Sequence, residues 1–562
     1  MVEISLKVIK AHTLENSIKH NGEANKDAIL SGLFAEGLEK KDVKEFIPKI
    51  KEVIKEVSSL SLEEQKKELE KLDIKTSKRE SRTGLPELIN AKKGEVIMRF
   101  APFPSGPLHI GNARPLILND EYVKTYGGKL ILFMDDTIGS EAKPIEPESY
   151  KLIEDGIEWL GIKVDKKIIY KSDRIKKYYE YAEELIKKGY MYVCACSREE
   201  IAELKLKQIE CSCRQFSSEE QLKRWKEMFV AREGTRTVRL KTSMDNPDPA
   251  FRDRIMFRIS DRPHAKLGKK YRVYPLLDFT WAIDDHIFGI THILRGNDLM
   301  METKVEKFIW DIFKWKHPEI IYNGQFTIEG IEISKSKGSN EVRSGEYLGW
   351  NDPRTWSLQS LRDRGITTEA LREFILNMGI KKTNVTIPID ALYALNNKNL
   401  NDAPRYFFIE NPTKITIKGT PDLTAKIPLN PNRTLGDKIY KTTQEFLIDG
   451  QDFGLMQNKN YRLMHLLNFK SDNILRMKPR EFSFVSEKPD NNLKTKFIHW
   501  LPANEKNINV EIRMPNNKII KGLGEPKLSD LKIGTIIQFE RFGFVRLYKK
   551  NKSGMEFWFA NN

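Results

Sequence analysis

The sequence predicts a multidomain protein in which a Rossmann-like α/β domain lies between an N-terminal helical region and C-terminal β-barrels. Its 562 residues are enough for three to four domains. In the middle of the chain, short apolar strands alternate with helical patterns, which is the rhythm of a parallel sheet. Beyond Asn411, short alternating strands are separated by Pro, Gly and Asn turns, which is typical of β-barrels.

The composition is that of a soluble globular protein, with 40% apolar and 31% charged residues. We find no run of 18 or more apolar residues and no signal-peptide pattern, so we expect a cytoplasmic protein with no membrane partner. The net charge is +16, and residues 411–562 contribute +11 of it, with 26 Lys and Arg against 15 Asp and Glu. A basic surface is often merely solvated, but a basic region confined to one part of a chain is typical of a polyanion-binding module.

The first 93 residues are predicted to be helical and to carry no chemistry. Apolar side chains recur at helical spacing between Phe46 and Val57, and Ser61 forms with Glu64 a capping box that opens the next helix. Residues 75–84 are polar and basic, which favours a linker over an RNA contact.

The stretch from Met98 to Arg114 reads as a strand that runs into a helix. A loop rich in Pro and Gly ends the strand, and a helical pattern begins at about Leu108. Open parallel sheets bind ligands at such loops. His109 and Asn112 lie on the first helical turn, beside backbone N–H groups that have no intrahelical partner. We therefore expect a nucleotide phosphate here, although the spelling excludes both a P-loop and Gly-x-Gly-x-x-Gly.

A continuous apolar run at residues 130–134 predicts a buried parallel strand that ends at Asp135. This carboxylate could cap the next helix or hold a ligand, and the spacing alone does not decide between the two. Predicted helices at about 148–160 and 173–188 then alternate with short strands at 167–170 and 190–195. The same sheet is expected to resume at residues 271–279, and a helical stretch is expected at about 368–409.

All four cysteines lie within twenty residues, as the pairs Cys194 with Cys196 and Cys211 with Cys213. Two close pairs separated by one loop match zinc-ligand spacing, because four thiolates can then converge tetrahedrally. The alternative is a set of reduced thiols with no role, since disulfides are rare in the cytosol. We expect zinc over this alternative because no cysteine falls outside the cluster. Its role should be structural, because four thiolates leave no position open for a substrate.

Two segments resemble the signatures of one enzyme family. Residues 99–111, Arg-Phe-Ala-Pro-Phe-Pro-Ser-Gly-Pro-Leu-His-Ile-Gly, are similar to archaeal-type glutamyl-tRNA synthetases, which are class I aminoacyl-tRNA synthetases of the glutamate and glutamine group. Residues 330–339, Gly-Ile-Glu-Ile-Ser-Lys-Ser-Lys-Gly-Ser, resemble the mobile Lys-Met-Ser-Lys-Ser loop of class I, with Lys335 at the second lysine. Several positions depart from the family pattern: Phe103, Asn112 in place of the second His, Phe133, Leu277 and Glu332.

The resemblance implies a ligase that uses ATP and Mg²⁺ to form glutamyl-adenylate and then transfers glutamate to tRNA. The implied catalytic residues are His109, Asn112 and Lys335. ATP would be bound by His109, Gly111, Asn112, Ser334 and Lys335. The amino acid would be bound by Arg99, Asp135, Tyr274, Asp278 and Arg295, with Asp135 on the α-ammonium. Two arginines suit a substrate with two carboxylates, because guanidinium binds carboxylate in a two-pronged geometry.

The resemblance also implies domain limits and partners. The expected parts are a helical region (1–93), two halves of a catalytic domain (94–190 and 271–345), an insertion with the cysteines that binds the tRNA acceptor end (191–270), a helical connecting domain (346–410) and two anticodon-binding β-barrels (411–562). The partners would be L-glutamate and the tRNA for glutamate, with the tRNA for glutamine as a second candidate. We expect a monomer.

Three alternatives stay open at this point. A glutaminyl-tRNA synthetase shares the fold and both signatures, although the residues at 101–107 favour glutamate. A small-molecule nucleotidyltransferase also uses a similar helix, but it would not need the basic C-terminal module. A tRNA-binding paralogue without catalysis would explain the departures at Phe103, Asn112 and Glu332.

Overall fold

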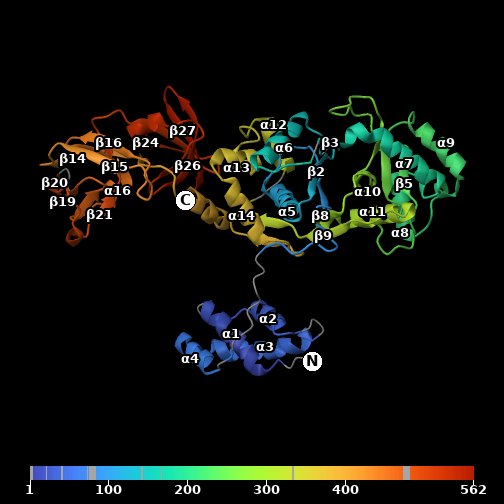
Figure 1. Cartoon of the computed structure of the whole chain (residues 1–562), viewed down its shortest axis with the longest axis horizontal. Helices are drawn as coiled ribbons and strands as arrows, with labels where there is room; N and C mark the ends of the chain where they lie inside the picture. Colours follow the sequence, from blue (N-terminus) through green and yellow to red (C-terminus); the bar gives the residue numbers. More distant parts are fainter. Residues whose placement is uncertain are drawn as a thin grey trace. The chain divides into compact units, whose positions relative to one another are not determined.

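The computed structural model describes residues 4–20, 22–38, 42–72, 74, 84–140, 143–165, 167–331, 335–472 and 481–562 (Figure 1). The chain forms two compact units, Met1–Gly84 and Leu85–Asn562. No helix in these described ranges is both long enough and apolar enough to cross a membrane.

The N-terminal unit is helical, as predicted, and packs around its own apolar core. Its helices are α1 (Leu6–Lys19), α2 (Lys26–Ala35), α3 (Val43–Ser58) and α4 (Leu62–Leu72). The capping box that opens α4 is confirmed, because the backbone N–H of Ser61 donates to Oε2 of Glu64 at 2.8 Å. Most of the predicted linker, residues 75–83, lies outside the described residues.

The core of the second unit is a parallel α/β sheet. Strands β1 (Ile97–Phe100), β2 (Lys129–Met134) and β3 (Ile169–Tyr170) pair in parallel in that order, and so do β8 (His292–Gly296) and β9 (Glu319–Asn323). The N–H of Thr291 donates to the carbonyl of Ile97 at 2.9 Å, which places β8 on the free side of β1. The order β3-β2-β1-β8-β9 therefore reverses at β1, and α/β sheets bind ligands at such a switch point. The associated helices are α5 (Ile110–Tyr126), α6 (Pro147–Trp159), α10 (Leu277–Ile287) and α11 (Met300–Phe313).

The insertion after β3 is an antiparallel sheet with helices beside it. Its strands are β4 (Met191–Cys194), β5 (Thr237–Leu240), β6 (Ile255–Ile259) and β7 (Val273–Pro275), and its helices are α7 (Ile175–Lys187), α8 (Arg198–Lys207) and α9 (Ser218–Met228). The prediction that the parallel sheet resumes at residues 271–279 is wrong. Strand β7 pairs antiparallel with β6, with Phe257 opposite Pro275, and α10 begins two residues after β7 ends. A short apolar strand has the same local pattern in either sheet.

A helical segment connects the α/β core to the C-terminal sheets. It contains α12 (Lys335–Ser344), α13 (Leu358–Arg364), α14 (Thr368–Met378) and α15 (Asp390–Leu400), together with β10 (Phe326–Ile328) paired to β11 (Val385–Ile387). The predicted helix does not continue to residue 409. Pro404 has no N–H for a helical hydrogen bond, and β12 (Arg405–Tyr406) and β13 (Phe408–Ile409) join a sheet instead.

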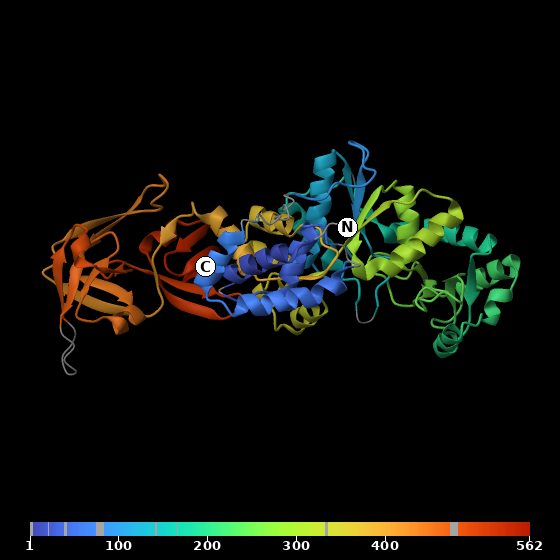
Figure 2. The same ribbon diagram turned by 90° about the horizontal axis from the view of Figure 1, so that it is seen from below.

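The C-terminal region forms two β domains, and strands of the second lie beside α13 while the first lies farther from the helices (Figures 1 and 2). The first contains β14 (Pro412–Lys418), β15 (Leu423–Pro428), β16 (Asp437–Thr442), β17 (Glu445–Asp449), α16 (Gly450–Leu455), β18 (Asn460–Leu463), β19 (Asn468–Asp472), β20 (Glu481–Ser486), β21 (Lys496–Ile498) and β22 (Leu501–Pro502). The second contains β23 (Ile508–Arg513), β24 (Ile519–Gly524), β25 (Ile536–Phe539), β26 (Gly543–Asn551) and β27 (Gly554–Asn561). Its edge strands are β12 and β13, which only Phe407 separates, so this sheet is nearly closed.

Candidate active site

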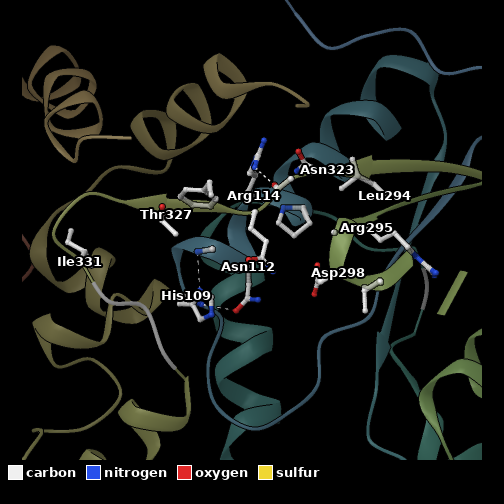
Figure 3. Close-up of a pocket in the computed structure, with 16 residues that line it drawn as sticks. His109, Asn112, Arg114, Leu294, Arg295, Asp298, Asn323, Thr327 and Ile331 are labelled. Carbon is white, nitrogen blue, oxygen red and sulfur yellow. Dashed lines mark hydrogen bonds between the residues drawn. The ribbon is translucent and has the colours of Figure 1, made fainter. Parts of the chain in front are cut away.

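The first turn of α5 is built by its own side chains (Figure 3). Nδ1 of His109 accepts the N–H of Gly111 at 3.0 Å, and Oδ1 of Asn112 accepts the N–H of His109 at 3.3 Å. Together they form a capping box, which an asparagine at the third helical position can complete. A Cβ on Gly111 would lie 2.8 Å from Cε1 of His109, so a larger residue here would require the His109 ring to move. The departure at Asn112 thus has a structural role.

Two adjoining cavities meet at this turn. The first, of about 500 Å³, is lined by His109, Gly111 and Asn112 together with the ends of β8 and β9. The second, of about 620 Å³, is lined by Arg99, Asp135 and Trp281. The two cavities share seven lining residues, among them His109, Asn112 and Arg295. A nucleotide in one cavity and an amino acid in the other would therefore meet at the start of α5.

The two predicted arginines reach the second cavity, and each is already paired with a carboxylate of the protein. Arg99 donates from Nε and Nη2 to both oxygens of Asp285, at 2.5 and 2.9 Å. Arg295 donates from both Nη atoms to Glu306, at 2.8 and 3.0 Å. Burial raises the pKa of Glu306 to about 7, although the charge of Arg295 opposes the shift.

Asp135 also lines the second cavity and also has an internal partner. Nζ of Lys171 lies 3.1 Å from its Oδ1 and donates to Oγ1 of Thr280 at 2.9 Å. Burial raises the pKa of Asp135, and the charge of Lys171 opposes that shift. Lys171, Asp285 and Glu306 were not identified from the sequence. The local sequence does not mark them, because each has another charged residue within two positions.

Tyr274 and Asp278 are not brought to these two cavities. The hydroxyl of Tyr274 donates to the carbonyl of Tyr271 at 3.0 Å. Its ring is buried in the apolar core that also contains Phe257 and Phe279. Asp278 forms an ion pair with Arg254 in a neighbouring cavity. Their assignment to the amino acid stays a prediction.

Besides Asn112, three other departing residues have surroundings that the structure describes. Phe133 is fully buried and packs edge-on against Phe288, with ring centroids 5.1 Å apart. Phe103 lies under Nζ of Lys143, 5.1 Å from the ring centroid, and lines the second cavity with Leu277.

The second signature segment lies partly outside the described residues. Residues 332–334, which include Glu332 and Ser334, are not among the described residues, and neither is the side chain of Lys335. Helix α12 begins at Lys335. Trp350 lies over both signature segments. A Cβ on Gly106 would be 2.9 Å from Cη2 of Trp350, and one on Gly338 would be 3.5 Å from its Cζ3. The sequence did not single out this tryptophan.

The four cysteines come together, as predicted. Their Sγ atoms all lie within 4.8 Å of one another, and those of Cys194 and Cys211 are 4.0 Å apart. Four thiolates around a tetrahedral zinc ion would lie about 3.8 Å apart, given a Zn–S distance of about 2.3 Å. The set therefore fits this metal.

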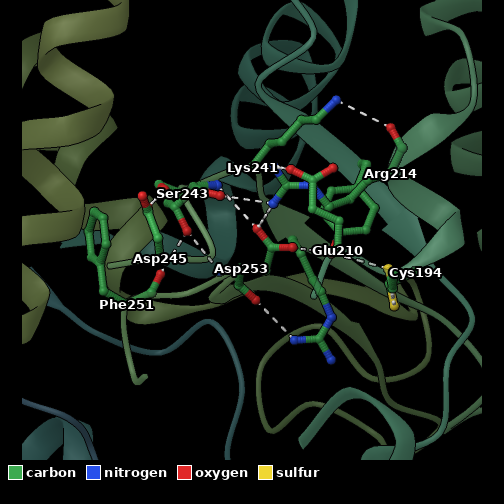
Figure 4. A network of polar contacts seen from close by, with 12 residues as sticks. Cys194, Glu210, Arg214, Lys241, Ser243, Asp245, Phe251 and Asp253 are labelled. Carbon is green, nitrogen blue, oxygen red and sulfur yellow. Dashed lines mark hydrogen bonds and ion pairs between the residues drawn. The ribbon is translucent and has the colours of Figure 1, made fainter. Parts of the chain in front are cut away.

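A buried polar network supports the second cysteine pair (Figure 4). Arg214, directly after Cys213, donates to Oδ1 of Asp253 at 2.5 Å and to the carbonyl of Thr242 at 2.8 Å. The hydroxyl of Tyr192, on β4, donates to Oδ2 of the same aspartate at 2.6 Å. The network ties both cysteine segments to Asp253, which lies two residues before β6.

Comparison with known proteins gives consistent matches along the chain. Residues 95–402 match the family model described as the catalytic domain of class I tRNA synthetases (E and Q). Residues 403–483 and 497–548 match two models described as anti-codon binding domains of the same group. A glutamate–tRNA ligase of Methanocaldococcus jannaschii is 41% identical over 98% of both chains, and one of Pyrococcus abyssi is 41% identical over 97% of both. A solved glutamate tRNA ligase from Elizabethkingia meningosepticum superposes with a TM-score of 0.40 at 19% identity, covering 54% of this chain and 70% of that one.

Proposed function

This chain belongs to the class I tRNA synthetases of the glutamate and glutamine group, and we propose that it joins L-glutamate to the 3′ end of its tRNA in two steps. The observation that carries the proposal is the pair of cavities that meet at His109 and Asn112. Relatives that match nearly the whole chain are glutamate–tRNA ligases, which supports glutamate over glutamine as the amino acid.

The first step needs only positioning and charge stabilisation. ATP lies on the first turn of α5, whose N–H groups and helix dipole favour phosphate, and Mg²⁺ would enter with the nucleotide and offset part of its charge. Glutamate lies beside Arg99, Asp135 and Arg295, so that its α-carboxylate attacks the α-phosphate and pyrophosphate leaves. Lys335 stabilises the charge that builds up on the phosphates. No protein nucleophile is required.

In the second step, the 2′-hydroxyl of the terminal ribose attacks the adenylate carbonyl and AMP leaves. The tRNA reaches the site because the two C-terminal β domains hold its anticodon. Their match to anticodon-binding models and the +11 charge of residues 411–562 support this role. The insertion with the cysteines holds the acceptor end. The monomeric state and the cytoplasmic location stay predictions.

Aminoacylation assays test the function directly. With ATP, labelled L-glutamate and purified tRNA for glutamate, we expect charged tRNA together with glutamate-dependent ATP–pyrophosphate exchange. A parallel assay with L-glutamine identifies a glutaminyl enzyme. A parallel assay with glutamate and the tRNA for glutamine identifies an enzyme that charges both tRNAs. Absence of exchange at every tRNA concentration would refute the proposal and favour a tRNA-binding paralogue.

The four cysteines hold a structural zinc ion in this proposal. We expect elemental analysis to find about one zinc per chain. The variant Cys213→Ser should lose the zinc, melt at a lower temperature and charge tRNA more weakly, because the metal stabilises the insertion that binds it. The matched control is Ser212→Ala, which changes an exposed residue between two of the cysteines. If the purified protein contains no metal and chelators do not change its melting temperature, the zinc site is excluded.

A further inference from the structure

One tryptophan lies among the charged groups of the second cavity, called the amino-acid cavity from here on because the proposed function places glutamate in it. Trp281, on α10, is only 6% exposed and lines the cavity with Arg99 and Arg295. Three cationic groups lie against its ring system: the guanidinium carbon of Arg99 is 4.7 Å from the ring centroid, that of Arg295 is 5.0 Å away and Nζ of Lys171 is 5.2 Å away. Each distance is within the range of a cation–π attraction.

The three cations come from separate parts of the core. Arg99 lies on β1, Arg295 on β8, and Lys171 directly after β3. Like charges gathered around one ring repel each other, so this arrangement needs compensation. Each cation therefore has its own buried carboxylate, in the pairs Arg99 with Asp285, Arg295 with Glu306 and Lys171 with Asp135. The three positive charges are balanced by three negative ones.

Besides these separate pairs, the three cations share one contact, the Trp281 ring, which also lines the cavity. The carboxylates occupy Nε and Nη2 of Arg99 and both Nη atoms of Arg295. The protein itself thus takes most of the strong donors of both guanidinium groups. The ring adds a second contact to each carboxylate pair and so helps to fix where each arginine presents its charge to the cavity.

We propose that Trp281 is a positioning residue for Arg99, Arg295 and Lys171, and through them a determinant of glutamate selection over glutamine. The inference rests on the proposed function. A carboxylate gains more than an amide from a fixed cation, because charge-assisted hydrogen bonds are about twice as strong as neutral ones. When the cations are no longer fixed, glutamate loses more than glutamine does.

Three variants separate the aromatic face from other properties of the side chain. Trp281→Phe keeps a ring for the cations, and it removes no hydrogen bond because the indole N–H has no partner in the described structure. Trp281→Leu keeps an apolar side chain without a ring, and Trp281→Met replaces it if the leucine variant does not fold. The control Trp310→Leu removes a fully buried tryptophan from α11, whose indole N–H donates to the carbonyl of Ala282 at 2.9 Å.

Glutamate- and glutamine-dependent ATP–pyrophosphate exchange is measured for each variant with tRNA present. In Trp281→Leu we expect the KM for glutamate to rise at least tenfold, the KM for ATP to stay within twofold, and the preference for glutamate over glutamine to fall. Trp281→Phe should recover most of the glutamate KM. Trp310→Leu should lower the melting temperature without changing the preference.

Two results would overturn the inference: a glutamate KM and a preference that stay within twofold in Trp281→Leu, or a phenylalanine variant as impaired as the leucine variant. Both results are compared with those of the unmodified chain, which must itself charge tRNA with glutamate. If the unmodified chain shows no such activity, the proposed function fails instead, and the same assay reports it.

Discussion

Replacing Lys335 by alanine is expected to slow adenylate formation by about 100- to 1,000-fold, which is the usual loss when one charge-stabilising group is removed from a transition state. The lysine matches the second lysine of the class I loop and is the first residue of α12. If it acts only as the phosphates react, kcat and kcat/KM should fall together while the KM for ATP stays unchanged. The measurement is glutamate-dependent exchange at saturating ATP, glutamate and tRNA.

The matched control for Lys335 is Lys337→Ala, which removes the same charge two residues later on α12. We expect the control to retain activity within about threefold, since a loss that depended only on net charge would appear in both variants. Equal losses in the two variants, or an alanine variant of Lys335 that retains full activity, would contradict the role given to this lysine.

Local features of the chain were predictable because their signals are local. Strand β2, the capping box at Ser61 and the helix that starts after His109 depend on periodicity, on turn residues and on one or two cap side chains. The cysteine cluster was predictable for the same reason, because two pairs within twenty residues can converge through a single loop.

The pairs that shape the amino-acid cavity were not predictable in this way. Arg99 and Asp285 are 186 residues apart in the sequence, and nothing near either residue indicates the other. The sequence suggested two arginines waiting for substrate carboxylates, whereas the structure gives each arginine a carboxylate of its own. Likewise, the local pattern around Tyr274 does not reveal that β7 joins the insertion sheet, because pairing partners are set by the tertiary fold.

Replacing Arg295 by leucine is expected to have two separable effects, because the residue both lines the cavity and neutralises Glu306. Glu306 is fully buried, and at a pH where it is ionised, removing its partner leaves an uncompensated charge that costs about 3–5 kcal/mol in the free energy of unfolding. The glutamate KM should also rise at least tenfold. Unfolding by denaturant and exchange kinetics measure the two effects independently.

The double variant Arg295→Leu with Glu306→Leu tells the two effects apart. Replacing both members of a buried ion pair by apolar residues is often neutral for stability, so most of the lost free energy of unfolding should return. The glutamate KM should stay high, because the cavity still lacks its cation. If the double variant also recovered glutamate binding, Arg295 would act only through stability and its role in the cavity would be wrong.

The pH dependence of the single variant follows from the same carboxyl group. Burial already raises the pKa of Glu306 above its unfolded value when Arg295 is present, and losing the guanidinium removes the charge that opposed this shift. A group whose pKa is raised by folding stabilises the protein below its unfolded pKa, and that contribution is lost as the pH rises through the folded pKa. The stability deficit of Arg295→Leu relative to the double variant should therefore be small near pH 5 and largest above pH 8. A deficit that does not change with pH would show that Glu306 is not its source.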